Sequence, residues 1–195
     1  TSAVNGPHTQ EELREMAIIA SEEPEFIGKD AEPFDVVLER AQEDLHLGPE
    51  RIIEKTTELL KTDDQRRRGL ELATRIVVAD AIVRPSHVKV LEELTDAFAL
   101  SRQELEDLVV SSQRRLIRFM MVYLIYVTAT VDGEVHPEEF EEMIPFALNL
   151  PVFRGITTDQ FRFINLSVRA HLPYMREEWG LEYICGTLLK AAELL

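Results

Sequence analysis

The chain has 195 residues, of which 45% are hydrophobic and 29% charged, and its formal net charge is −15. This length leaves room for one large or two small hydrophobic cores in an ordinary globular protein. The negative charge excludes nucleic acid and anionic membrane surfaces as favoured partners, because both would repel the chain. The same charge is compatible with cations, with protein partners of basic or mixed charge, or simply with a soluble surface.

Two further features bear on the compartment. Cys185 is the single cysteine, which rules out an internal disulfide and fits a reducing compartment. The longest apolar stretch, Phe119 to Val127, is far too short to cross a bilayer. We therefore expect a cytoplasmic protein without membrane insertion.

Apolar periodicity and capping signals predict an all-α protein. Thr9-Gln-Glu-Glu12 fits a capping box that opens a helix to about Ser21, and Thr62 caps another. Prolines open several of the rest. The predicted helices are 9–21, 33–45, 49–60, 63–79, 85–98, 103–110, 113–130, 137–150, 157–172 and 176–194. Residues 111–113 contain no proline or glycine, so the helices at 103–110 and 113–130 could merge into one. The inward faces include Ile52, Ile53, Thr56, Leu59 and Leu60 in one helix, and Val88, Leu91, Leu94 and Phe98 in another.

An internal repeat links the two ends of the chain. Residues 1–34 align without a gap on residues 128–161, with twelve identities. Asn5, Gly6 and Glu12 fall on Asp132, Gly133 and Glu139, and the later identities include Phe26 on Phe153 and Phe34 on Phe161. A fainter third copy has Asp80, Ala81, Pro85 and His87 where the last copy has Asp132, Gly133, Pro137 and Glu139. The pattern indicates a duplicated half-domain.

The repeated stretch suits a cation site at a helix–loop–helix corner. Asp132-Gly133 reads as a tight turn, and Pro137 suits the first position of a helix. Asp132 and Glu139 would then face each other and offer oxygen ligands to a divalent metal. A nitrogen ligand from His87 would admit zinc or manganese. The candidate ligands are Asp132, Glu139, Asp80, His87, Asn5 and Glu12.

A purely structural interpretation of these residues stays open. Glu138 and Glu139 would offset the exposed N–H groups of a helix start, Glu12 belongs to the capping box, and Asp132 can simply make the turn. An EF-hand is improbable, because its first and third positions would be Thr128 and Thr130 instead of carboxylates.

The segments Asp132 to Glu139 and Asp80 to Leu100 resemble the two halves of the tellurite-resistance TerB-like domain. The resemblance also rests on Leu91 to Ser101, which looks like the segment that ends the second half. It implies an all-helical bundle of repeated helix–loop–helix units, in a cytoplasmic protein tied to tellurite and chemical stress. It also implies a metal site at the acidic turns, here Asp132, Glu139 and Asp80. Asn5 departs from the family's aspartate and Ala81 from its glycine.

The order of the segments differs from the family's plan. Residues 1–110 look like a TerB-like unit that lacks its first helix, and residues 111–195 look like the first half of a second unit. In this tandem arrangement Asn5 and Glu12 would face Asp80 and His87. In a permuted single domain, Asp80 and His87 would instead converge with Asp132 and Glu139.

Two functions follow as hypotheses. One is a non-enzymatic stress-response module that binds a divalent metal; the other is an acidic helical scaffold for protein partners, which includes self-association. Catalysis finds little support, because the chain has no Gly-rich phosphate loop, nucleophile elbow or His-Glu-x-x-His motif.

Overall fold

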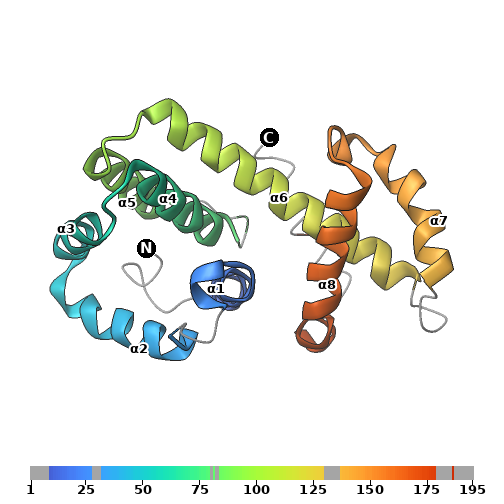
Figure 1. Cartoon of the computed structure of the whole chain (residues 1–195), viewed down its shortest axis with the longest axis horizontal. Helices are drawn as coiled ribbons and strands as arrows, with labels where there is room; N and C mark the ends of the chain where they lie inside the picture. The colour runs from blue at the N-terminus through green and yellow to red at the C-terminus, as the bar shows by residue number, and fades with distance from the viewer. Residues whose placement is uncertain are drawn as a thin grey trace. The chain divides into compact units, whose positions relative to one another are not determined.

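The described part of the chain is helical and contains no β-strand, so the predicted all-α class is confirmed (Figure 1). The structure is a computed structural model that describes residues 9–27, 32–79, 81, 84–129, 137–178 and 186. None of the helices in these ranges is both long enough and apolar enough to span a membrane.

The chain divides into two compact units, residues 1–112 (unit 1) and residues 113–195 (unit 2). Unit 1 holds α1 (Gln10–Glu22), η2 (Pro24–Phe26), α2 (Phe34–Asp44), η3 (Leu45–Leu47), α3 (Pro49–Leu59), α4 (Asp63–Val78), α5 (Pro85–Ala97) and the start of α6 (Arg102–Ala129). Unit 2 holds the rest of α6, α7 (Pro137–Leu148), η4 (Pro151–Phe153) and α8 (Thr158–Glu178).

The helix starts follow the predicted capping signals. The Glu12 N–H donates to Thr9 Oγ1 at 3.2 Å, and the Thr9 N–H donates to Glu12 Oε2 at 3.1 Å. Thr62 and Gln65 form the same reciprocal pair at the start of α4. Each box satisfies backbone donors that the first turn of a helix leaves without partners.

The helices predicted at 103–110 and 113–130 do merge into one helix, α6, because residues 111–113 contain no proline or glycine to interrupt its hydrogen bonds. Three other sequence predictions are wrong in detail. The helix α8 continues past the predicted end at residue 172 to Glu178. Val88 and Leu59, predicted to point inward, are 39% and 68% exposed. Val88 follows the buried His87, and each helical step of about 100° turns the side chain to another face.

Each unit has its own hydrophobic core. In unit 1, α4 packs with α5, α3 with α5, and α1 with α4. The centre of this core is a cluster of seven buried side chains: Leu70, Val77, Val90, Leu91, Leu94, Phe98 and Leu105. In unit 2, Met120 and Tyr123 of α6 and Phe153 and Phe161 beyond it are at most 1% exposed. Burial of aromatic and aliphatic side chains of this size supplies the main driving force for folding each unit.

The sequence repeat reappears in the structure. The first residues of α1 and α7, Gln10 and Pro137, are 127 positions apart, and η2 and η4 are offset by the same number. Phe26 and Phe34 pack edge to face with ring centres 5.6 Å apart. Their counterparts Phe153 and Phe161 also pack edge to face, at 5.1 Å. The two copies therefore share helix positions and an aromatic contact, not only residue identities.

Two alanines adopt the left-handed backbone conformation that favours glycine. Ala99, with φ +57°, follows α5, where its N–H bonds to Asp96 O and the Leu100 N–H bonds to Thr95 O. Ala81, with φ +55°, stands where the other motif copies have Gly6 and Gly133. The third copy thus keeps a glycine-like backbone at this position without the glycine.

Replacing Ala99 with glycine is expected to stabilise the protein by about 0.5–1 kcal/mol. The substitution removes a steric cost of about 1–2 kcal/mol, partly offset by the greater freedom of glycine in the unfolded chain. Ala99 is exposed, so little packing is lost. Urea unfolding measures the effect, and Ala97→Gly, at the last residue of α5 where the methyl group packs against the core, should instead destabilise by about 1 kcal/mol. Equal destabilisation by both changes would contradict the prediction.

Candidate functional site

In each of the three motif copies, the residue seven positions after the Asn or Asp of the turn occupies the same position in its helix. Glu12, His87 and Glu139 are each the third residue of a helix, since α1, α5 and α7 begin at Gln10, Pro85 and Pro137. The first turn of a helix presents free N–H groups and the positive end of the helix dipole. A carboxylate is favoured at this position, and His87 is the exception in the set.

Two of these equivalent residues meet inside unit 1. Glu12 Oε1 lies 3.9 Å from His87 Nε2, which joins the N-terminal turns of α1 and α5. Both side chains are almost fully buried, at 2% and 1% exposure. Glu12 Oε1 also lies 3.9 Å from Nη1 of Arg84. A buried carboxylate thus stands beside an imidazole and a guanidinium, both contributed by the start of α5.

The local backbone positions each member of this group. Glu12 uses Oε2 for the Thr9 capping box, which leaves Oε1 directed to α5. Arg84 is the N-cap residue of α5, and its carbonyl accepts the His87 N–H at 2.9 Å. The Arg84 side chain is 36% exposed and reaches the carboxylate from the surface. Glu12 therefore has both a structural role and an oxygen that faces a possible metal ligand.

A buried ionic cluster fixes α1 against α4 and so determines where Glu12 lies. Arg75, 5% exposed on α4, donates from Nε to Glu15 Oε1 at 2.8 Å and from Nη2 to Glu22 Oε2 at 3.1 Å. Its Nη1 lies 3.6 Å from Glu23 Oε1. Buried charges of this kind are tolerated only when they are paired and hydrogen-bonded. Because α4 packs on α5, the cluster indirectly holds Glu12 opposite His87.

Arg68, about two helical turns before Arg75 on α4, extends the same cluster. Its Nε donates to Glu23 Oε2 at 3.1 Å, and its Nη1 donates to Glu71 Oε2 at 2.5 Å. Partial burial lowers the pKa of Arg68, but the hydrogen bonds and charges of Glu71 and Glu23 outweigh that effect and raise the pKa overall. Arg68 therefore stays charged and, together with Arg75, pairs with carboxylates of α1 and of its C-terminal cap.

The six predicted metal ligands differ in what the structure says of them. Glu12 and His87 are brought together, which is the pairing expected for a tandem arrangement. Asn5, Asp80 and Asp132 lie outside the described residues. Glu139 is described only as the third residue of α7, without its side chain. Within the described ranges, no three His, Cys, Asp or Glu side chains gather in a geometry that would hold a metal ion.

Sequence reasoning missed the two arginines at this site. Arg84 aligns with Thr9 and His136 in the other copies, so the repeat gave no signal for a cation there. Arg75 has a signal in hindsight: it is a charged residue between Leu70, Val77 and Val78 on the buried face of α4. A charge on a buried helical face requires a partner, but its identity depends on which helix packs there.

Comparison with known proteins assigns no relative to the chain: no family model, curated protein or solved structure matches it.

Arg75→Ala is expected to cost about 3–5 kcal/mol of unfolding free energy, because it leaves buried carboxylates without their cation. Arg67→Ala on the same helix removes an exposed arginine whose ion pair with Glu104 spans 3.7 Å, and should cost less than about 1 kcal/mol. Arg75→Lys, which retains charge with fewer donors, should fall between the two. Urea unfolding of the three variants provides the measurement. Equal losses of unfolding free energy in Arg75→Ala and Arg67→Ala would refute the stabilising role of the buried ionic cluster.

Proposed function

We propose that unit 1 is a non-enzymatic, TerB-like stress-response module that binds a divalent metal ion between α1 and α5. The observation that supports this proposal is the pairing of Glu12 and His87, two equivalent motif positions 75 residues apart in the sequence. The proposal contains no catalytic step.

The donor chemistry of the pair fits a transition-metal ion or zinc. A carboxylate oxygen and an imidazole nitrogen are the ligand types that Zn²⁺ and Mn²⁺ accept in proteins, whereas calcium prefers oxygen alone. Asn5 and Asp80, seven residues before Glu12 and His87, are the proposed further ligands. Asp132 and Glu139 are the corresponding proposed pair in unit 2.

Metal binding at this place would compete with Arg84. In the structure, Arg84 supplies the positive charge beside Glu12 Oε1, and a bound cation would replace it. Because the Arg84 side chain is already 36% exposed, its guanidinium can rotate away from Glu12 into the solvent, where water hydrates its charge. A bound metal would then link the N-terminal turns of α1 and α5 directly. Such a link is a means of coupling metal supply to the stability of unit 1.

Calorimetric titration of metal-stripped protein with Zn²⁺, Mn²⁺, Mg²⁺ and Ca²⁺ tests the site. We expect saturable binding of Zn²⁺ or Mn²⁺ near one equivalent in unit 1, with affinity reduced at least about tenfold in Glu12→Gln and in His87→Ala. Glu12→Gln is the sharper variant, since glutamine can still close the capping box while the ligand charge is lost. Affinity should also fall on acidification, because protons compete for the imidazole.

His46→Ala serves as the control, because His46 is an exposed histidine of η3 in the same unit. Its affinity for the metal should equal that of the unmodified protein. Asp132→Ala reports separately whether the turn of unit 2 holds a further ion. The proposal would be refuted if no ion produced a binding heat in protein whose circular dichroism spectrum shows intact helices. Glu12 would then have only its structural role in the capping box.

The alternative function, an acidic scaffold for protein partners, is favoured by the distribution of charge. Residues 1–112 contain 25 acidic and 13 basic side chains and therefore carry −12 of the formal charge of −15. Clustered charge of one sign attracts partners of the opposite sign and accelerates their association in a salt-dependent way. This candidate predicts salt-sensitive binding of a basic partner to unit 1.

A further inference from the structure

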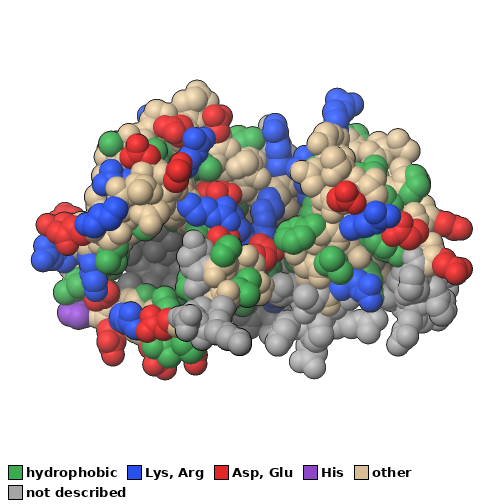
Figure 2. All heavy atoms as spheres, in the orientation of Figure 1, with side chains coloured by type: hydrophobic (Ala, Val, Ile, Leu, Met, Phe, Trp, Pro, Cys, Tyr) green, Lys and Arg blue, Asp and Glu red, His purple; other side chains and the backbone are tan. Residues whose placement is uncertain are grey.

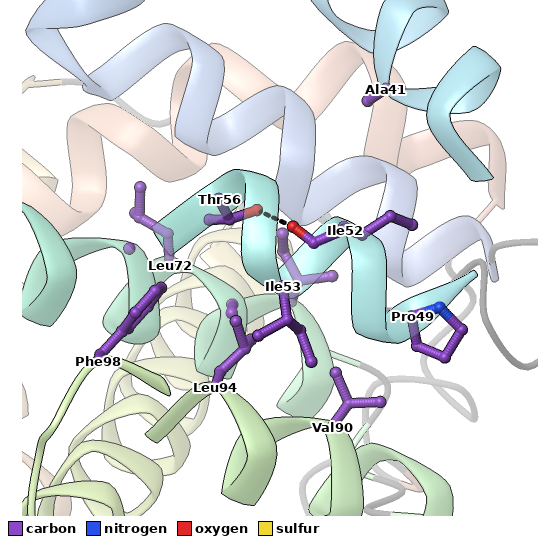
Figure 3. Close-up of a pocket in the computed structure, with 12 residues that line it drawn as sticks. Ala41, Pro49, Ile52, Ile53, Thr56, Leu72, Val90, Leu94 and Phe98 are labelled. Atoms are coloured by element: carbon purple, nitrogen blue, oxygen red, sulfur yellow. Dashed lines mark hydrogen bonds between the residues drawn. The ribbon is translucent and has the colours of Figure 1, made fainter. Parts of the chain in front are cut away.

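Unit 1 contains an apolar cavity that the metal proposal does not use. The cavity has a volume of about 340 Å³ and is lined from four helices, α2 to α5 (Figure 3). Among the described residues that line it, only Thr56 has a polar group in its side chain, and this hydroxyl donates to Ile52 O at 2.8 Å within α3. The lining therefore offers an occupant mainly apolar contact.

The cavity lies beside α3, which packs on α5 without burying any of its own residues completely, and α2 contributes only the exposed Ala41 to the lining. Ile52 and Ile53 of α3 both line the cavity and are only partly buried; Figure 3 shows Ile53 beside Val90 and Leu94 of α5, whereas the Ile52 side chain extends away from them. Leu72 and Ile76, one helical turn apart on α4, are also partly buried cavity residues outside the central cluster around Leu70 and Val77. The helices α3 and α4 thus both present apolar side chains to the cavity, and these side chains do not fill it.

A second cavity of about 420 Å³ extends this hollow. Both cavities include Gly69 and Leu72 in their lining, and the second continues to Phe26 and Leu60. Its lining also includes four polar or charged residues, Glu23, Asp64, Gln65 and Arg68. The apolar surface is therefore elongated, with a polar end that carries two carboxylates and one guanidinium. An elongated apolar groove between helices is the geometry that receives the apolar face of an amphipathic helix.

The charge around the groove determines the kind of helix that fits. The four helices that line it, α2 to α5, carry thirteen acidic and eight basic side chains, an excess of five negative charges. In Figure 2 acidic side chains, with basic ones among them, lie over α2 and α3, on the left and lower left of the view. We infer that the groove formed by α2 to α5 of unit 1 is a docking site for a basic amphipathic helix of a partner protein. The inference gives the acidic-scaffold candidate a location and is independent of the metal site.

A designed helical peptide of about 18 residues, with leucine on one face and lysine on the other, is the probe. Fluorescence anisotropy should show saturable binding to the full chain that weakens at least about tenfold between roughly 0.05 M and 0.5 M NaCl. A peptide with glutamate in place of lysine, and a scrambled lysine peptide that has lost its apolar face, should both bind at least about tenfold more weakly.

Matched variants locate the binding. Ile52→Ser and Leu72→Ser should each weaken peptide binding at least about tenfold, because both shorten an apolar stripe of the groove. Leu59→Ser, on the same helix as Ile52 but 68% exposed and outside both cavity linings, should leave binding unchanged. Glu12→Gln and His87→Ala should also leave it unchanged, so that failure of the metal site and failure of the groove give different results.

Three outcomes would overturn the inference. One is equal binding of the lysine and glutamate peptides, which would remove the role of charge. Another concerns the neutral dye N-phenyl-1-naphthylamine. If the dye binds, Ile52→Ser abolishes its binding and no peptide displaces it, the groove is a small-molecule site. The third is sedimentation of the free chain as a dimer that Ile52→Ser dissociates, which would make a second copy the occupant.

Discussion

The buried guanidinium of Arg75 is the interaction on which the arrangement of unit 1 depends. It joins three glutamates, Glu15 and Glu22 of α1 and Glu23 directly after it, to a helix of the hydrophobic core. Each of these groups would be costly to bury alone, so the cluster is stable only when α1 lies in one orientation on α4. Hydrophobic contact alone tolerates rotation and sliding of a helix, whereas a network of directional bonds does not.

That orientation connects the repeat to the candidate metal site. The three motif copies begin a helix in the same way, yet one of them carries histidine where the others carry glutamate. A carboxylate facing a carboxylate would repel, but a carboxylate facing an imidazole is attracted when the imidazole is protonated and can share a cation when it is neutral. The exchange of glutamate for His87 therefore permits two helix N-termini to meet in a buried position. Arg84 completes the charge balance from the surface.

The two proposals for unit 1 use different parts of the same helices. The Glu12–His87 pair lies at the N-terminal turns of α1 and α5, whereas the groove is lined by α2, α3, α4 and residues of α5 from Val90 onward. The groove exists because α3 is an amphipathic helix that packs on α5 without burying any of its own residues completely. A close-packed interior leaves few voids larger than a water molecule, so an open apolar space of this size is unusual. The apolar side chains of a bound partner would fill it.

The sequence by itself determined the helical class, most helix starts and the repeat. Capping residues such as Thr9 and Thr62, and prolines that open helices, act through bonds and sterics within a few neighbouring residues, and such local effects can be read directly. The end of α8 was less predictable, because a helix ends where packing stops favouring it, not only where a breaking residue occurs.

Only the tertiary structure decided which motif copies meet. Glu12 and His87 were both candidates from the sequence, but their pairing depends on how α1 is placed, and Arg75 sets that placement through contacts 52 to 60 residues away along the chain. The groove was equally hidden, since Ile52 and Leu72 have the apolar pattern of core residues. Periodicity shows which face of a helix is apolar, but not whether a neighbouring helix fills the space against that face.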